Sequence, residues 1–273
     1  MKLLNLINWD ESEIKYDLTT FPDGEPQISF PDEFDRKDSV KVMCRITSAE
    51  ELFLLAQVGD ILDRQEIEWD LFITYLMSMR MDRVMDFNRP FSLKIVCNIL
   101  NGMNYRSVCI LEAHSNRAKN LLGSRCWCQE LNYGSYIPQQ SNVVFPDAGA
   151  YQRYREYSKV WGHLVFNKTR DLETGKIKEF SIGRNVNCYY STFVFIDDLC
   201  DAGGTFLGEL KVLKEKYPNY RFEIIVCHAV NIEGLKKLCN NFDHVTITNS
   251  YCDYEYQPSN NNLTVIDAVS YTH

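Results

Sequence analysis

The chain has 273 residues, 45% of them hydrophobic and 24% charged, which is the ordinary composition of a soluble globular protein. Its formal net charge of −8 argues against a general nucleic-acid-binding surface, because such a surface needs an excess of basic residues. The sequence shows neither a signal peptide nor a long apolar run, so we expect a cytoplasmic protein with no membrane partner and with reduced cysteines. No pair of C-x-x-C motifs is present, which argues against a structural zinc site.

The first half of the chain alternates expected strands with expected helices. The apolar pattern predicts strands near residues 3–7, 27–30, 40–45, 69–77 and 107–111. Helices are expected from a cap at Thr47 or Ser48 to about Arg64, and from about residue 91 to 100, where Asn101-Gly102 ends the helix. This alternation predicts an α/β fold with a largely parallel sheet.

The second half repeats this plan. Strands are expected near residues 142–145, 162–167, 189–196, 222–227 and 245–248, with a tyrosine-rich helix after residue 149. Residues 132–141 break the pattern, so we expect two domains, 1–135 and 136–273. Residues 263–270 are expected to pack back on the first domain.

The stretch from residue 193 to 205 organises the chain. It is predicted to run from a buried parallel strand through an acidic loop to the start of a helix near Thr205. Gly203 and Gly204 let backbone N–H groups approach a phosphate, and the helix start adds unpaired amides and a positive dipole end. Asp197 and Asp198 suit ribose hydroxyls or a hydrated Mg²⁺.

This stretch resembles the phosphoribosyl-diphosphate loop of type I phosphoribosyltransferases and of ribose-phosphate pyrophosphokinases, also called PRPP synthetases. The family usually has Thr or Ser where this chain has Ala202. The residues that the resemblance places on a ribose phosphate are Asp197, Asp198, Asp201, Ala202, Gly203, Gly204 and Thr205.

Two further motifs resemble the ATP-binding segments of the PRPP synthetases. The segment Phe21-Pro22-Asp23-Gly24-Glu25 is similar to the family's Phe-Ser-Asp-Gly-Glu, which reaches into the ATP site of a neighbouring subunit. The segment Arg80-Met81-Asp82-Arg83 is similar to Arg-Gln-Asp-Arg, with Met81 in place of Gln. The ATP-binding residues that the resemblance implies are Phe21, Asp23, Glu25, Arg80, Met81, Asp82 and His114.

The resemblance also implies Mg²⁺ as cofactor. His114 follows Glu112 at a strand end, as in the family's Asp-Leu-His, and Asp147 lies in Phe-Pro-Asp-Ala-Gly, which is similar to Ser-Pro-Asp-x-Gly. By similarity, His114 and Asp147 hold the metal against the ATP phosphates. Lys168 and Arg170 precede an expected polar hairpin around residues 173–175, as in the family's Lys-x-Arg catalytic loop. These two cations would stabilise charge that develops during phosphoryl transfer.

The resemblance implies two tandem type I phosphoribosyltransferase-like domains with mainly parallel sheets and a catalytic cleft between them. The implied reaction moves the β,γ-diphosphate of ATP to the 1-hydroxyl of ribose 5-phosphate and releases AMP. Because residues 21–25 would complete a neighbour's ATP site, a homo-oligomer of at least two copies is implied.

The acceptor stays open, because Ala202 lacks a hydroxyl whose hydrogen bond to a charged phosphate is worth about 1.5–3 kcal/mol. One divergent relative in phage NAD-rebuilding pathways acts on ADP-ribose at the same hydroxyl, so ADP-ribose is an alternative acceptor. Two rival functions are a phosphoribosyltransferase and a catalytically silent PRPP synthetase-associated subunit. The ATP-site motifs speak against the first, and retention of His114, Lys168 and Arg170 speaks against the second.

Overall fold

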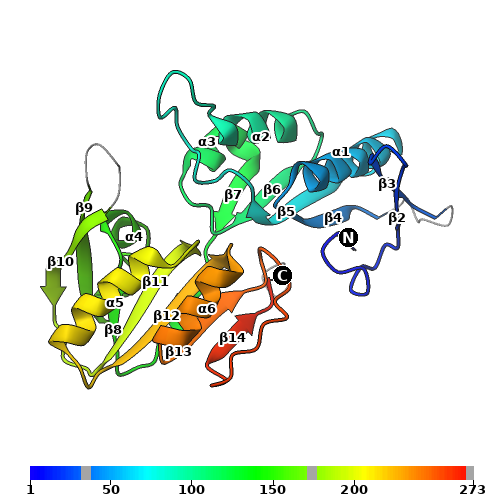
Figure 1. Ribbon diagram of the computed structural model, residues 1–273. Coiled ribbons are helices and arrows are strands. Elements are labelled where there is room, and N and C mark those ends of the chain that lie inside the picture. The colour runs from blue at the N-terminus through cyan, green and yellow to red at the C-terminus, as the bar shows by residue number, and fades with distance from the viewer. Residues whose placement is uncertain (32–37, 171–176, 269–273) are drawn as a thin grey trace. The chain divides into compact units, whose positions relative to one another are not determined.

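The computed structural model describes residues 1–31, 38–170 and 177–268, which form two compact α/β units (Figure 1). The first unit spans Met1–Leu131, and the second begins at Asn132. Each unit is built on its own β-sheet with helices packed against it.

The first unit has a five-stranded sheet in the order β1-β4-β5-β6-β7, and every neighbouring pair is parallel. Its strands are β1 (Lys2–Asn5), β4 (Val40–Ile46), β5 (Trp69–Leu76), β6 (Ser107–Leu111) and β7 (Cys126–Gln129). Its helices are α1 (Ala49–Arg64), α2 (Ser92–Asn101), α3 (Arg117–Leu122) and the 3₁₀ turn η1 (Gly123–Arg125). Edge strand β7 lies outside every range that the apolar pattern predicts.

Helix α1 begins as the sequence predicts, at a capping box. The Ser48 hydroxyl accepts a hydrogen bond from the Glu51 amide at 3.1 Å, and the Glu51 carboxylate accepts one from the Ser48 amide at 3.0 Å. A two-stranded hairpin, β2 (Asp17–Thr20) and β3 (Pro26–Ser29), lies against this helix. The Gln57 side chain fixes it by bonding the backbone of Ile28 and Pro26 at 3.0 and 2.7 Å.

The second unit has a seven-stranded sheet in the order β10-β9-β8-β11-β12-β13-β14. Its strands are β8 (Asn142–Phe145), β9 (Gly162–Arg170), β10 (Ile177–Val186), β11 (Thr192–Cys200), β12 (Arg221–Ala229), β13 (His244–Thr248) and β14 (Leu263–Ile266). Its helices are α4 (Ala148–Arg153), α5 (Gly204–Lys216) and α6 (Ile232–Asn241), with 3₁₀ turns η2 (Tyr133–Ser135) and η3 (Tyr157–Lys159). Only the β9–β10 pair is antiparallel among the described strands of this sheet.

The core of the second unit lies between this sheet and helices α5 and α6. Strand residues such as Phe195 and Ile224 meet Phe206 and Leu210 of α5 and Leu235 of α6, all buried. The apolar spacing that predicts α5 therefore marks its buried face correctly.

Two expectations for the second unit need correction. Residues 263–266 form β14, which pairs in parallel with β13 of the same unit, and the packing of residues 263–270 on the first unit stays a prediction. Strand β11 continues to Cys200 because its ladder with β12 extends to Ala229, so both acids lie inside the strand and not in a loop after it. The tyrosine-rich helix is short, since α4 ends at Arg153.

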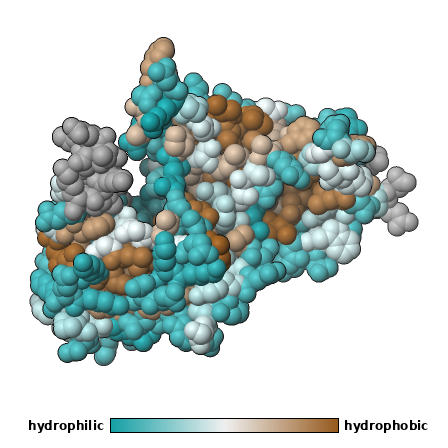
Figure 2. Space-filling model, in the orientation of Figure 1, coloured by the Kyte–Doolittle hydropathy of each residue, from teal (hydrophilic) through white to brown (hydrophobic). Residues whose placement is uncertain are grey.

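The described residues contain no helix that is both long and apolar enough to span a membrane. All ten cysteines are free, as the sequence predicts. The face shown in Figure 2 is mostly hydrophilic, with separate apolar patches.

Candidate active site

The candidate site of the second unit lies where neighbouring parallel strands end. Asp147 follows β8, Lys168 lies near the end of β9, and residues 201–203 link β11 to α5. Because these strands are parallel, their carboxyl ends share one edge of the sheet, which is where open α/β folds bind ligands.

The loop that the sequence assigns to a ribose phosphate has the backbone shape for an anion. Gly203 caps α5 in the left-handed region, with φ of 75°, and a Cβ there would lie 3.5 Å from the Gly234 carbonyl oxygen. A Cβ at Gly204 would meet no described atom within 4 Å, so the N-terminus of this 13-residue helix is open to a ligand. Asp201 and Ala202 are exposed, and Thr205 is half-buried.

Helix α6 supports this loop from the side. A Cβ at Gly234 would lie only 1.8 Å from the Asp201 carbonyl oxygen, so the helix and the loop are in direct backbone contact. The Asn231 side chain caps α6 and donates to the Asp201 carboxylate at 3.4 Å. The sequence predicts neither Gly234 nor Asn231 as a site residue, because contact between segments thirty residues apart leaves no local pattern.

The two adjacent acids of β11 have different surroundings. The Asp198 side chain is 2% exposed and forms an ion pair with Arg153 of α4. Asp197 is half-buried, and burial together with the charge of Asp198 raises the pKa of its carboxyl. Successive strand side chains point to opposite faces, so Asp197 and Asp198 lie on different faces of the sheet, and their contact with a ribose stays a prediction.

Lys168 and Asp147 contact each other directly. The Lys168 ammonium donates a hydrogen bond to the Asp147 carboxylate at 3.1 Å. Burial favours the protonated form of Asp147, but the Ala150 amide and the Lys168 charge outweigh it and hold the pKa below its usual range. The Arg170 side chain and residues 171–176 lie outside the described residues, so the second expected catalytic cation has no described position.

Glu209 of α5 is a site residue that the motifs did not identify. Its side chain is 0% exposed, and its Oε1 atom lies 3.7 Å from the Lys168 ammonium. Burial raises the pKa of this carboxyl to about 9, an effect that Lys168 opposes and Asp147 strengthens. Its only signal in the sequence was its position, three residues after Phe206 on the buried face of α5.

The first unit brings the segment 80–83 and the loop that carries His114 together at its own sheet edge. The Ser115 hydroxyl, next to His114, donates to the Asp82 carboxylate at 2.9 Å, and Arg83 forms a 2.9 Å ion pair with the same acid. Although burial opposes ionisation, these bonds hold the pKa of Asp82 below its usual range. Arg80 and Met81 are exposed beside it.

Strained backbone marks the same edge. Ser78 after β5 and Glu112 after β6 have φ of 65° and 46°, in the left-handed region that non-glycine residues avoid. Phe21, Asp23 and Glu25 lie elsewhere in this unit, exposed in the turn between β2 and β3.

The donor atoms at these edges fit a Mg²⁺ ion held mainly by its substrate. No cluster of three or more His, Cys, Asp or Glu side chains able to hold a metal occurs among the described residues. Asp147 offers an ionised oxygen donor, and Mg²⁺ commonly takes one or two carboxylates and completes its shell with phosphates and water. His114 and Asp147 belong to different units, so each is described within its own.

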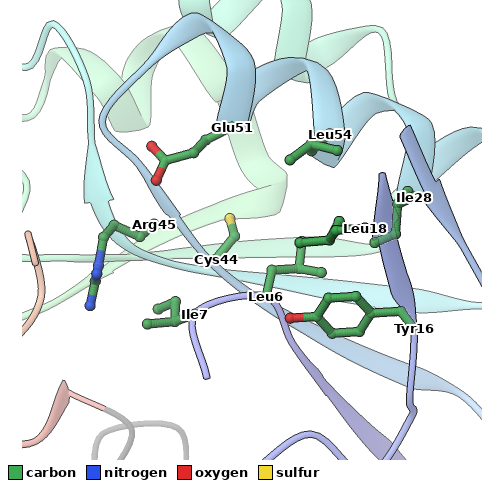
Figure 3. A pocket seen from close by; sticks show the side chains of 9 residues that line it. All are labelled: Leu6, Ile7, Tyr16, Leu18, Ile28, Cys44, Arg45, Glu51 and Leu54. Carbon is green, nitrogen blue, oxygen red and sulfur yellow. The ribbon is translucent and has the colours of Figure 1, made fainter. Parts of the chain in front are cut away.

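A cavity of about 120 Å³ in the first unit contains none of the predicted site residues. Figure 3 shows Arg45 and Glu51 at one end and Tyr16, Leu18 and Ile28 at the other. Glu51 is already engaged in the cap of α1. The cavity therefore shares no lining residue with the motifs.

Comparison with known proteins supports one family. The ribose-phosphate pyrophosphokinase of Pyrococcus abyssi is 23% identical over 254 residues, which cover 87% of this chain and 84% of the relative. That of Saccharolobus solfataricus is 24% identical over 203 residues, which cover 70% of this chain and 69% of the relative. No protein-family profile matches the sequence.

A solved structure has the same fold. The crystal structure of phosphoribosylpyrophosphate synthetase from Mycobacterium smegmatis matches with a TM-score of 0.78 at 17% identity, covering 99% of this chain and 96% of that chain. This match confirms the expected α/β class with mainly parallel sheets.

Proposed function

We propose that this chain, a divergent relative of the ribose-phosphate pyrophosphokinases, transfers the β,γ-diphosphate of ATP to the 1-hydroxyl of a 5-phosphorylated ribose. In this reaction the hydroxyl oxygen bonds to the β-phosphorus, the bond from that phosphorus to the α-phosphate oxygen breaks, and AMP leaves with that oxygen. The hydroxyl proton is released. The observation that carries the proposal is the open glycine loop at the start of α5 together with the Lys168–Asp147 pair on neighbouring strands.

The residues of the second unit fit the chemical demands of this transfer. The amides at the start of α5 would bind the 5-phosphate, and Asp197 would accept hydrogen bonds from ribose hydroxyls. Lys168 would stabilise negative charge on the transferring diphosphate. A bound Mg²⁺, for which Asp147 would supply the carboxylate ligand of this unit, would neutralise phosphate charge and polarise the phosphorus.

The first unit supplies the residues proposed for ATP. Arg80 is an exposed, permanently charged donor beside the Asp82–Ser115 pair and suits a phosphate oxygen. Phe21, Asp23 and Glu25 are exposed in their turn, as a segment that serves a neighbouring subunit must be. Met81, which is 36% exposed, offers no hydrogen bond where the family has Gln.

Ribose 5-phosphate is the acceptor that the named relatives support, and ADP-ribose is the second candidate. The observation that favours ADP-ribose is the exposed part of the loop at residues 202–204. Ala202 is exposed and lacks a hydroxyl donor, and the side of Gly204 faces open space. In ADP-ribose the phosphate on the 5-hydroxyl bridges to a further group, so it has fewer free oxygens to accept hydrogen bonds and needs space for that group. The missing hydroxyl at Ala202 and the open side of Gly204 support this alternative.

The test is a direct comparison of acceptors. The protein is incubated with ATP, Mg²⁺ and either ribose 5-phosphate or ADP-ribose, and AMP and the diphosphorylated sugar are quantified. We expect stoichiometric AMP with at least one acceptor, and the ratio of kcat/KM values identifies which. Absence of AMP with both acceptors would contradict the proposal and favour a silent subunit, whereas diphosphate release from added PRPP and a base would indicate a phosphoribosyltransferase.

A further inference from the structure

The buried carboxyl of Glu209 has no function in the reaction as described above. Both of its oxygens lack a hydrogen-bond donor among the described residues, and its side chain has no exposed area. Burying a polar group without a hydrogen-bond partner is destabilising, and a leucine at this position of α5 would avoid that cost.

The cation nearest to this carboxyl is the Lys168 ammonium. It lies 3.7 Å from Glu209 Oε1, which is ion-pair distance and slightly too long for a hydrogen bond, and 3.1 Å from Asp147 Oδ2. The Lys168 side chain is 12% exposed. It contacts the buried Glu209 carboxyl on one side and the Asp147 side chain, which is 47% exposed, on the other.

Packing holds Glu209 in this place. Its neighbour Gly208 lies so close to Phe180 of β10 that an added Cβ would come within 2.1 Å of the ring. Helix α5 therefore packs directly on β10, and the Glu209 side chain beside this contact has no exposed area. A small movement of the flexible Lys168 side chain, by contrast, brings the ammonium within hydrogen-bond distance of Glu209.

We propose that Glu209 is a positioning residue that gives Lys168 a second, interior anchor, so that the ammonium stays at the site when Asp147 is engaged by another cation. This inference rests on the proposed function, in which both Asp147 and Lys168 serve the phosphates at the same time. Without Glu209, loss of Asp147 would leave Lys168 with no described carboxylate partner and free to extend into solvent.

The test removes the two anchors separately and together in the ligand-free protein. Asp147→Asn keeps the cap of α4, because Asn caps helices as well as Asp does, but removes the charge. Glu209→Leu removes the interior anchor and keeps the volume. The readout is the rate at which Lys168 is acetylated in a brief pulse of acetic anhydride, measured by peptide mass spectrometry, with exposed Lys159 as internal standard.

Each single variant is expected to stay within about threefold of the wild-type labelling rate, and the double variant to label at least about tenfold faster. Glu215→Leu, an exposed position on the same helix, is the matched control in the Asp147→Asn background and should leave the rate unchanged. If Glu209→Leu does not fold, Glu209→Gln replaces it.

A double variant that labels no faster than Asp147→Asn alone would overturn the inference. So would a Glu209→Leu protein in which Lys168 is already as reactive as in the double variant. Neither result depends on substrates, so failure here is distinguishable from failure of the proposed reaction, which AMP formation reports.

Discussion

At the scale of single residues, Lys168 links the proposed chemistry to the fold. It contacts Asp147 on one side and Glu209 on the other, and only the first of these neighbours belonged to a recognisable motif. Motif residues could be predicted because their chemistry is carried by short, ordered strings of sequence. Glu209 could not, because its importance arises from a contact between β9 and α5 across forty-one positions of sequence.

Lys168→Ala should reduce kcat for AMP formation by about 100-fold or more, because a donor aimed at developing phosphate charge acts mainly in the transition state. Binding of ATP, measured by calorimetry, should change by less than about threefold, since the proposed ATP residues lie in the other unit. Lys159→Ala, at an exposed lysine of the same unit, is the control and should leave both values unchanged. Wild-type turnover in Lys168→Ala would contradict the assignment.

Glu209→Gln should alter how stability depends on pH. Burial raises the pKa of Glu209 to about 9, so the folded state holds this proton more tightly than the unfolded chain does. The resulting stabilisation is complete below the ordinary glutamate pKa and is lost as the pH rises through about 9.

Glutamine does not titrate, so the variant should gain stability relative to wild type between about pH 5 and pH 9. The Tm of Glu209→Gln minus the Tm of the wild type should be larger at pH 9 than at pH 5 by roughly 2 °C or more. This is about what 1 kcal/mol produces in a chain of this size. Thermal unfolding at both pH values measures the effect, with exposed Glu215→Gln as control. A Tm difference that is the same at both values would show that Glu209 titrates normally.

At the scale of elements, the accuracy of the sequence analysis follows the range of the interactions that form each element. Helix α1 was predicted almost to the residue, because its cap and its apolar stripe are encoded within the helix itself. Strand β7 was missed, because it has only four residues and is specified by its neighbour in the sheet. The extension of β11 through its two acids has the same origin, since pairing with β12 keeps polar residues in the ladder.

The contact between α6 and the phosphate loop gives a prediction about two elements at once. Gly234→Ala places a methyl group 1.8 Å from the Asp201 carbonyl oxygen, so the helix or the loop must move. We expect a loss of about 1–3 kcal/mol in the free energy of unfolding and a higher KM for the sugar phosphate, because overpacking here displaces the loop.

Gly204→Ala is the matched stability control, because an alanine methyl there meets no described atom within 4 Å and Ala favours a helix. Urea unfolding of both variants measures the change in the free energy of unfolding. Equal stability of Gly234→Ala and wild type would mean that the loop and α6 are not packed together in solution.

At the scale of the whole molecule, the net charge of −8 opposes the approach of ATP and sugar phosphates, so binding must depend on local cations and amides. The structure places such groups at one edge of each sheet. Asp147 and Asp82, both kept ionised by their partners, lie beside Lys168 and Arg83 at these edges. The order of motifs along the chain could be predicted from sequence, but the pairing of each acid with its cation required the fold.

The proposed homo-oligomer follows from apolar side chains that the described part of the first unit leaves uncovered. Leu18 and Phe21 of the hairpin and Phe53 of α1 are 55%, 47% and 45% exposed, and Phe21 and Phe53 line the same shallow groove. Two large apolar side chains exposed in one groove, Phe21 and Phe53, are typical of an interface, since a solvated surface gains nothing from them. We therefore expect sedimentation to give a mass that is a multiple of 31.9 kDa, at least twice that value.

Phe53→Gln should shift the protein toward 31.9 kDa and reduce AMP formation, because residues 21–25 could no longer serve a neighbour. Ile95→Gln, at a 54% exposed position of α2, is the control and should change neither the mass nor AMP formation. A monomeric wild type with full activity would show that the turn at residues 21–25 serves its own chain or no ATP site at all.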